Sequence, residues 1–172
     1  MEGTFFTSIW CLGFIAIFFV FFFFSCFRKI EVYEQGVVFR HGKFVGVKKS
    51  RLIFLWPFLD HLMKVDMRTL TLNVFSGETI SRDQVGVEVN IAVYFRVIDA
   101  QTATLEVADY SQAVETISQD ILGKVVNMNE LDTLLVQQER INEELEQAIN
   151  KQTQLFGVEV SGVDIKNVRK LS

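Results

Sequence analysis

The sequence contains few of the residues that most often carry chemistry. Cysteine occurs only at Cys11 and Cys26, histidine only at His41 and His61, and proline only at Pro57. Metal sites and nucleophilic triads need several such residues at fixed spacing, and no Gly-rich phosphate loop is present. The sequence therefore predicts no catalytic, cofactor-binding or metal site. Because both cysteines precede residue 27, no disulfide is expected in the rest of the chain, as in reducing compartments.

The remaining polar candidates for catalysis lack partners. No Ser, Cys or carboxylate constellation surrounds His41 in the sequence, so we interpret it as a polar turn residue. Asp60 with Asp66, and Glu143 with Glu144, are better interpreted as surface charges than as acid/base pairs. We therefore expect a protein that is not an enzyme.

A long hydrophobic run lies near the amino terminus. Phe5–Phe27 has no charge and no proline over 23 residues, ten of which are Phe. As a helix it would extend about 35 Å, enough to cross a hydrocarbon core of about 30 Å. A cleaved signal peptide would need a basic start and an apolar stretch of only about 7–15 residues. We therefore predict an N-terminal membrane anchor, residues 1–29, followed by a domain at 30–172.

The charges beside this run predict its orientation. Arg28 and Lys29 follow the run, and only Glu2 and the amino terminus precede it. Basic flanks stay on the cytoplasmic side, so the domain is expected in the cytoplasm. Two charges are a small bias, and the opposite orientation stays open. Cys26 lies at the membrane exit, where it is either a palmitoylation site or a small lipid-facing residue.

Charge is distributed unevenly after the anchor. Arg28–Arg68 contains nine Lys/Arg and four Asp/Glu, a net +5, whereas Thr69–Ser172 contains eight and sixteen, a net −8. An anionic leaflet attracts the basic part, which is the part nearest the bilayer. The acidic remainder argues against nucleic acid as a partner.

One segment of the basic part suits a membrane interface. Basic residues precede the apolar run Leu52–Leu59, which is too short to span a bilayer and contains a proline. Charges would meet head groups while Trp lies at their level. The alternative is an apolar loop buried in the domain's own core. The candidate membrane-contact residues are Lys48, Lys49, Arg51, Trp56, Pro57 and Phe58.

Alternation of apolar residues predicts several strands. Ile30–Val47 is expected to form two strands joined by a turn near Arg40–Lys43, and Leu70–Val74 a third. In Val85–Val97 every odd position is apolar, which predicts a long strand with one buried face.

A period of three to four predicts two helices after Asp109. Asn129 is expected to be the N-cap of the second helix, which would run to about Leu155 and end at Gly157. Gly123 within the first helix suggests close packing or an irregularity. A returning strand follows, whose alternation shifts by one residue at Ser161–Gly162, as in a β-bulge. The fold class is therefore α+β, with two helices on one face of a mostly antiparallel sheet.

Six blocks follow one another after the N-terminal hydrophobic segment: Glu34–Arg40 with Gly42-Lys43, Phe58–Asp60, Val65–Thr69, Arg82–Val85, Tyr94–Val97 and Phe156–Val160. In this order they resemble the band 7 or SPFH domain (stomatin, prohibitin, flotillin), and most closely its stomatin and slipin group. The resemblance covers about Glu31–Arg169.

The sequence departs from this family's pattern at four places. Lys49-Ser50-Arg51 replaces a turn similar to Gly-Pro-Gly, Leu122 is followed by Gly123-Lys124 instead of Arg, and Gln138 stands where an Arg is frequent. The family's long charged C-terminal helix does not follow the domain, so we expect small or loosely held oligomers, co-assembly with a longer relative, or a truncated form.

The resemblance implies a non-enzymatic membrane scaffold. Such a protein would contact lipid, form homo-oligomers or co-assemble with longer SPFH relatives, and organise its lipid and protein environment. The alternative within the family is a regulatory subunit of a membrane protease or transporter.

Overall fold

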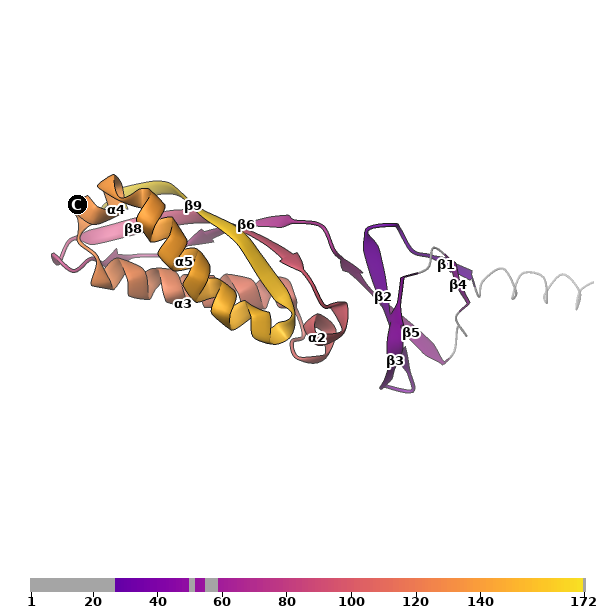
Figure 1. The fold of residues 1–172 in the computed structure, drawn as a ribbon. Helices are drawn as coiled ribbons and strands as arrows, with labels where there is room; N and C mark the ends of the chain where they lie inside the picture. Colours follow the sequence, from indigo (N-terminus) through magenta and orange to yellow (C-terminus); the bar gives the residue numbers. More distant parts are fainter. Residues whose placement is uncertain (1–26, 50–51, 55–58, 172) are drawn as a thin grey trace, which may run out of the picture. The chain divides into compact units, whose positions relative to one another are not determined.

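The computed structural model describes residues 27–49, 52–54 and 59–171 and divides the chain into two compact units at Lys64/Val65. Each unit is described by itself (Figure 1). Residues 5–26 of the expected span lie outside the described residues, and Phe27 already belongs to a strand. Within the described part of the chain, no helix combines the length and the apolar character needed to cross a membrane.

The N-terminal unit consists of strands in two small sheets. One sheet pairs β1 with β4, and the other has the order β3-β2-β5, whose last strand extends across the division between the units. The expected pair of strands is confirmed as the β2–β3 hairpin, whereas the sequence did not predict β1, β4 or β5. The bounds are β1 Phe27–Lys29, β2 Glu34–Arg40, β3 Lys43–Lys48, β4 Leu52–Phe54 and β5 Asp60–Asp66.

The C-terminal unit is an antiparallel sheet with helices. Strand β8 is central: β9 pairs along one side of it, and β6 and β7 pair along the other. The α+β class is confirmed, but the described strands form three sheets and not one. The bounds are β6 Leu70–Phe75, β7 Thr79–Ile80, β8 Gly86–Val97, α2 Ala100–Leu105, α3 Tyr110–Met128, α4 Leu131–Val136, α5 Gln138–Thr153, η1 Gln154–Phe156 and β9 Val158–Lys170.

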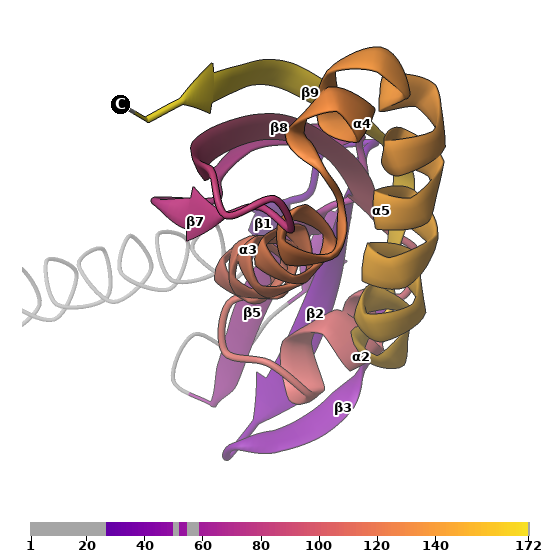
Figure 2. The same cartoon turned by 90° about the vertical axis from the view of Figure 1, so that its left-hand side faces the viewer.

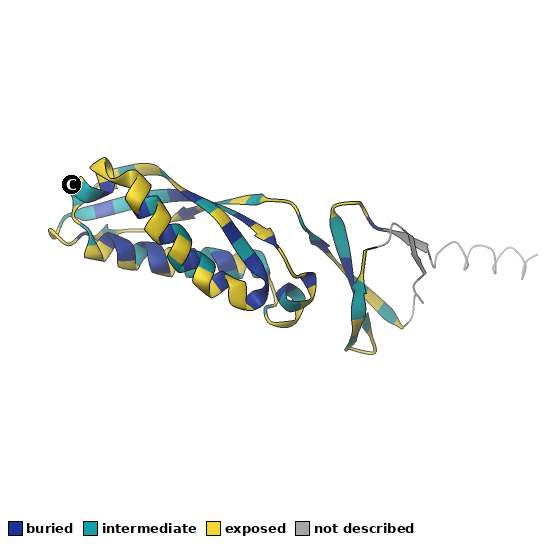
Figure 3. Ribbon diagram, in the orientation of Figure 1, coloured by how far each residue is buried: buried dark blue, intermediate teal, exposed yellow. Residues whose placement is uncertain are grey.

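Helices α3 and α5 cover the curved sheet of this unit. Helix α5 packs along β9, α3 packs against β6 and β7, and the two helices contact each other (Figure 2). Buried residues recur along the sheet and along one side of each of these helices (Figure 3). The predicted alternation of β8 is confirmed, because all its odd positions are buried: Val87, Val89, Ile91, Val93, Phe95 and Val97.

The junction between the helices differs from the prediction. Asn129 is the C-cap of α3 and not the N-cap of the next helix, since its Nδ2 donates to the Val125 carbonyl at 2.9 Å. The second helix is interrupted at Gln137, which has φ −108° and ψ 44°. Leu134 before the break is buried, whereas its neighbour Leu135 is exposed. The apolar period extends across this break, so the pattern predicts one continuous helix there.

The predictions for two glycines and for the bulge in β9 had different outcomes. Gly157 has φ 73° and ends η1, as expected. The prediction of close packing or an irregularity at Gly123 is wrong, because a Cβ there would meet no described atom within 4 Å and α3 continues through it from Tyr110 to Met128. The bulge is confirmed: Tyr94 pairs with Gly162 and Phe95 with Val160, which leaves Ser161 as the extra residue.

Candidate functional site

The tip of the β2–β3 hairpin is a two-residue turn. His41 and Gly42 have φ values of 51° and 74°, and Arg40 pairs with Lys43. Positive φ at both central residues is the type I′ geometry that matches the twist of paired strands. The interpretation of His41 as a turn residue is confirmed.

A bulge in β3 brings basic residues to one face of this hairpin. Val38 pairs with Gly46 and Phe39 with Phe44, so Val45 is the extra residue. Lys43 and Lys48 are five residues apart and would lie on opposite faces of a regular strand. With one residue bulged, they lie on the same face. The alternation of residues in the sequence did not predict this grouping, although an isolated glycine in a strand pattern, here Gly46, is the usual signal of a bulge.

Arg40 is held by a carboxylate of the neighbouring strand. Its Nε and Nη2 donate to the two oxygens of Asp60 at 2.7 and 3.0 Å. This hydrogen-bonded ion pair raises the pKa of the guanidinium. The Asp60 side chain is only 2% exposed, against 51% for Arg40. Asp60 is therefore not the exposed surface charge that the sequence indicated, because its carboxylate is buried and paired with Arg40.

The lysines around β3 keep their charge exposed. Lys43, Lys48 and Lys49 are exposed and form no ion pair within the described residues, whereas Lys64 pairs with Glu34 at 2.8 Å. Of the predicted membrane-contact residues, the structure thus places two, Lys48 and Lys49, in an accessible position. The others lie outside the described residues, as does the candidate palmitoylation site: Arg51, Trp56, Pro57, Phe58 and Cys26.

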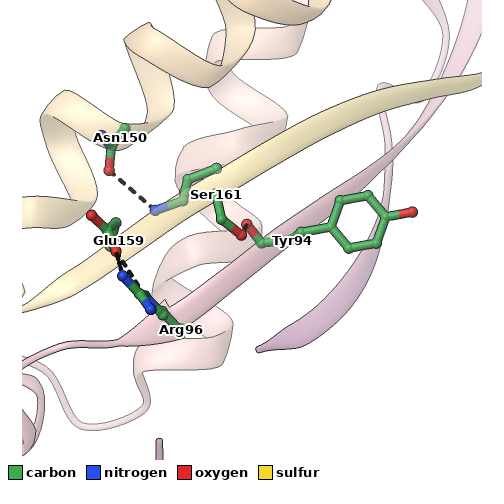
Figure 4. Close-up of polar contacts among 6 residues, drawn as sticks. Tyr94, Arg96, Asn150, Glu159 and Ser161 are labelled. Carbon is green, nitrogen blue, oxygen red and sulfur yellow. Dashed lines mark hydrogen bonds and ion pairs between the residues drawn. The ribbon is translucent and has the colours of Figure 1, made fainter. Parts of the chain in front are cut away.

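Side chains of α5 reach the outer edge of β9. The Oδ1 of Asn150 accepts from the Val160 N–H, and the Oδ1 of Asn142 accepts from the Ile165 N–H, each at 3.1 Å. Figure 4 shows Asn150 directed at β9 beside the Arg96–Glu159 ion pair, whose shortest N–O distance is 2.6 Å. These amides therefore satisfy backbone groups that β8 does not reach.

The region around α4 exposes apolar side chains. Val136 is 82% exposed, and Met128 and Leu135 are also exposed. The Arg82 N–H donates to the Asn129 carbonyl, which fixes the loop after β7 beside this junction. The surface around α4 is therefore a candidate for contact with another protein. Among the described residues, no three His, Cys, Asp or Glu side chains are grouped to hold a metal.

Known proteins resemble the chain over nearly its whole length. The family model of the SPFH domain / Band 7 family matches residues 28–170. A stomatin homolog of Pyrococcus horikoshii is 37% identical over 162 residues, 94% of this chain and 61% of that protein. Human stomatin-like protein 3 is 35% identical over 146 residues, 84% of this chain and 50% of that protein.

An uncharacterized protein of Archaeoglobus fulgidus is 39% identical over 149 residues, 87% of this chain and 60% of that protein. The chain thus covers less than two thirds of the length of these relatives. The expected family is nevertheless confirmed by the extent of the match. The chain belongs to the SPFH domain / Band 7 family, and within it to the stomatin group.

Proposed function

We propose that this protein is a membrane-anchored scaffold that associates with itself and organises the lipids and proteins around it. Membership of the stomatin group and the hydrophobic run Phe5–Phe27 support this proposal. The chain is anchored by one span and its domain, residues 30–172, faces the cytoplasm. It acts by binding and not by catalysis, and its partners are the bilayer, further copies of itself or longer SPFH relatives.

The exposed lysines around β3 carry the lipid contact in this proposal. Lys43 and Lys48 share one face of the hairpin and Lys49 follows directly, close in sequence to Arg51 and to the segment Trp56–Phe58. Anionic head groups stabilise each such charge near the surface by about 1 kcal/mol. The basic hairpin therefore holds the N-terminal unit against an anionic leaflet.

Reconstitution of the full chain tests this contact. A W10F variant leaves Trp56 as the only Trp, so bromine-labelled lipids should quench its fluorescence if it reaches the interface. We expect strong quenching with anionic lipids and weak quenching with zwitterionic lipids or high salt. Substituting K48E and K49E should reduce the quenching, whereas K124E and K151E provide a control with the same charge change in the C-terminal unit. Equal quenching in all these conditions would contradict the lipid contact.

The anchor is tested separately. Alkaline carbonate washing should leave the chain in the membrane pellet, because a span is held by the hydrophobic effect and not by charge. Release into the supernatant would contradict both the anchor and the orientation inferred from it.

A second candidate is a regulatory subunit of a membrane protease or transporter. The exposed apolar side chains of α4 favour it, since a client protein could cover them. Crosslinked copurification in mild detergent separates the two: a scaffold recovers mainly its own copies, a regulator one other protein in fixed ratio. Substituting L135E and V136E should lose the client without changing self-association.

A further inference from the structure

The two long edges of the C-terminal sheet are protected to different degrees. At the β9 edge, the amides of Asn142 and Asn150 occupy two backbone N–H groups. The β9 strand also contains two register shifts, one at Ser161 and one at Lys166, and bears Lys or Arg at three positions of its last part. Bulges, charges and covering side chains are the means by which proteins prevent edge strands from pairing with other chains.

Strand β6 has none of these protections. Its sequence, LTLNVF, has no charge, proline or glycine, and its pairing with β8 is continuous from Leu70 to Phe75 without a bulge. Among the strands that the structure describes, it is the only one of six or more residues that has no charged residue. β8 is its only strand partner in the described part of the chain, so no described strand pairs along its other edge.

The register shows which backbone groups lie at that open edge. The Ser76 N–H donates to the Val89 carbonyl at 2.9 Å and continues the register in which Phe75 pairs with Asn90. In an antiparallel pair, successive residues direct their N–H and C=O alternately toward the partner and away from it. Thr71, Asn73 and Phe75 therefore direct these groups away from β8. Their side chains are exposed on one face, with Phe75 51% exposed.

We propose that β6 pairs with β6 of a second copy, antiparallel and about a two-fold axis at Asn73. This register preserves the faces of both strands: Asn73 lies opposite Asn73 of the partner copy, and Thr71 lies opposite the partner copy's Phe75. All outward groups of the three residues are then hydrogen-bonded, and the two sheets become one. The inference rests on the self-association contained in the proposed function and specifies the surface that performs it.

The second copy is the occupant because the edge is complementary to itself. A two-fold contact requires that the same surface serve both partners, and an uncharged antiparallel strand meets this requirement without repulsion. The β9 edge does not meet it, since two register shifts interrupt it and the amides of Asn142 and Asn150 already occupy two of its N–H groups. Two copies held in one bilayer also encounter each other at a raised effective concentration, which favours a contact made of six backbone hydrogen bonds.

Cysteine crosslinking in native membranes tests the register. In a background with Cys11→Ser and Cys26→Ser, N73C should form an oxidised dimer, because Cα atoms of a hydrogen-bonded pair lie about 5.5 Å apart, within disulfide range. T71C alone should not crosslink, because four residues separate it from its copy, a distance of about 13 Å. T71C and F75C chains expressed together should crosslink with each other. Equal dimer from N73C and T71C, or no dimer from N73C, would overturn the pairing.

Charge substitution tests whether the pairing holds the assembly together. N73K puts like charges on the axis and should reduce the oligomer to smaller species with an unchanged circular dichroism spectrum, since Asn73 is exposed. Mixing N73K with N73E chains should restore association as a mixed pair. An unchanged oligomer in N73K would show that the chain associates through another surface and that only this inference fails. A wild-type chain that is monomeric in membranes would contradict the proposed self-association as well.

Discussion

The two units of the chain are stabilised in different ways. In the C-terminal unit, one face of the sheet and the facing sides of α3 and α5 enclose a continuous set of fully buried aliphatic side chains. In the N-terminal unit, a small cluster contains Ile30 and Val38 with Leu62 packed on it. Ion pairs at 2.7 and 2.8 Å connect its neighbouring strands. Burial of apolar side chains therefore stabilises most of the C-terminal unit. In the N-terminal unit, ion pairs supplement a small core.

This difference fits the roles proposed for the units. A surface that contacts anionic lipid head groups needs exposed basic side chains. Because charged side chains are costly to bury, a small unit that carries many of them has fewer residues left for an apolar core. A surface that associates with other proteins needs a rigid frame, which the sheet and helices of the C-terminal unit provide. The charges follow nearly the same division, with a net +5 in residues 28–68 and a net −8 in residues 69–172.

The largest expected effect comes from the core of the C-terminal unit. Leu145 on α5 is fully buried, so L145A should destabilise this unit by about 2–5 kcal/mol through lost burial and a cavity. The matched control is L155A, because Leu155 is 78% exposed, and it should be close to neutral. Hydrogen exchange of peptides from α3, α5 and β8 measures both. Slow exchange in L145A would contradict the assignment of this core.

Gly157 should be almost as sensitive, for a reason of backbone geometry. Its φ of 73° costs a non-glycine residue about 1–2 kcal/mol, and a Cβ would lie 2.7 Å from the Asp99 carbonyl oxygen. The Ile98 and Asp99 N–H groups both donate to the Gly157 carbonyl, so the backbone there cannot move freely. G157A should therefore lower the melting temperature more than G77A, since Gly77 has φ 66° but no described atom within 4 Å of its Cβ. Equal losses would show that the contact with Asp99 is relaxed.

The sequence predicted the elements whose pattern reflects local geometry. The alternation in β8, the hairpin turn at His41, the glycine cap at Gly157 and the shift at Ser161 were all confirmed. Each depends on φ preference or on a period of two over neighbouring residues. Such signals are contained in a few consecutive residues.

Features that depend on distant partners were missed. The buried Asp60 carboxylate pairs with Arg40 from another strand, and the Asn142 side chain accepts from a backbone N–H of β9, which lies beside α5. The break at Gln137 leaves the apolar period intact. The lysine face of the hairpin became visible only through the bulge at Val45, although Gly46 was a usable signal. Tertiary contacts decide these positions, and a single sequence does not contain them.

In the N-terminal unit the expected effect is smaller and local. R40M removes the guanidinium that donates twice to the buried Asp60 carboxylate, so strands β2 and β5 should open more readily. Hydrogen exchange should accelerate in peptides from residues 34–48 and 60–64 and stay unchanged in β8. R40K serves as the control: it keeps the charge but loses the two-pronged geometry, and should give an intermediate rate. Acceleration that extends into β8 would mean that the two units do not open separately.

A single substitution should stabilise the C-terminal unit slightly. Gly123 lies inside α3 with space around its Cβ position, so G123A should raise stability by about 0.5–1 kcal/mol through helix propensity. The control is G42A in the N-terminal hairpin, where φ is 74° and the same change should destabilise. A loss of stability in G123A would show that an unseen partner packs against this face of α3.

The smallest expected effect is a change in pH dependence at α2. The Asp99 carboxylate caps this helix, accepting from the Thr102 hydroxyl at 2.6 Å and from the Gln101 N–H at 3.0 Å. The Thr102 hydrogen bond is the main cause that lowers the pKa of Asp99. Because the folded pKa lies below the unfolded value of about 3.9, the stabilisation is present above that value and is lost as the pH falls through the folded pKa.

The variant D99N makes this contribution visible, since Asn caps a helix about as well as Asp but does not titrate. Its melting temperature should equal that of the wild type near pH 7 and fall less steeply below pH 4. Asp83 supplies a second test in the same unit: a hydrogen bond from the Ser81 hydroxyl, above all, lowers its pKa. With D83N and D99N together, the melting temperature should therefore fall even less steeply below pH 4. If the melting temperature falls equally steeply below pH 4 in the wild type and both variants, other carboxylates determine the acid stability of this unit.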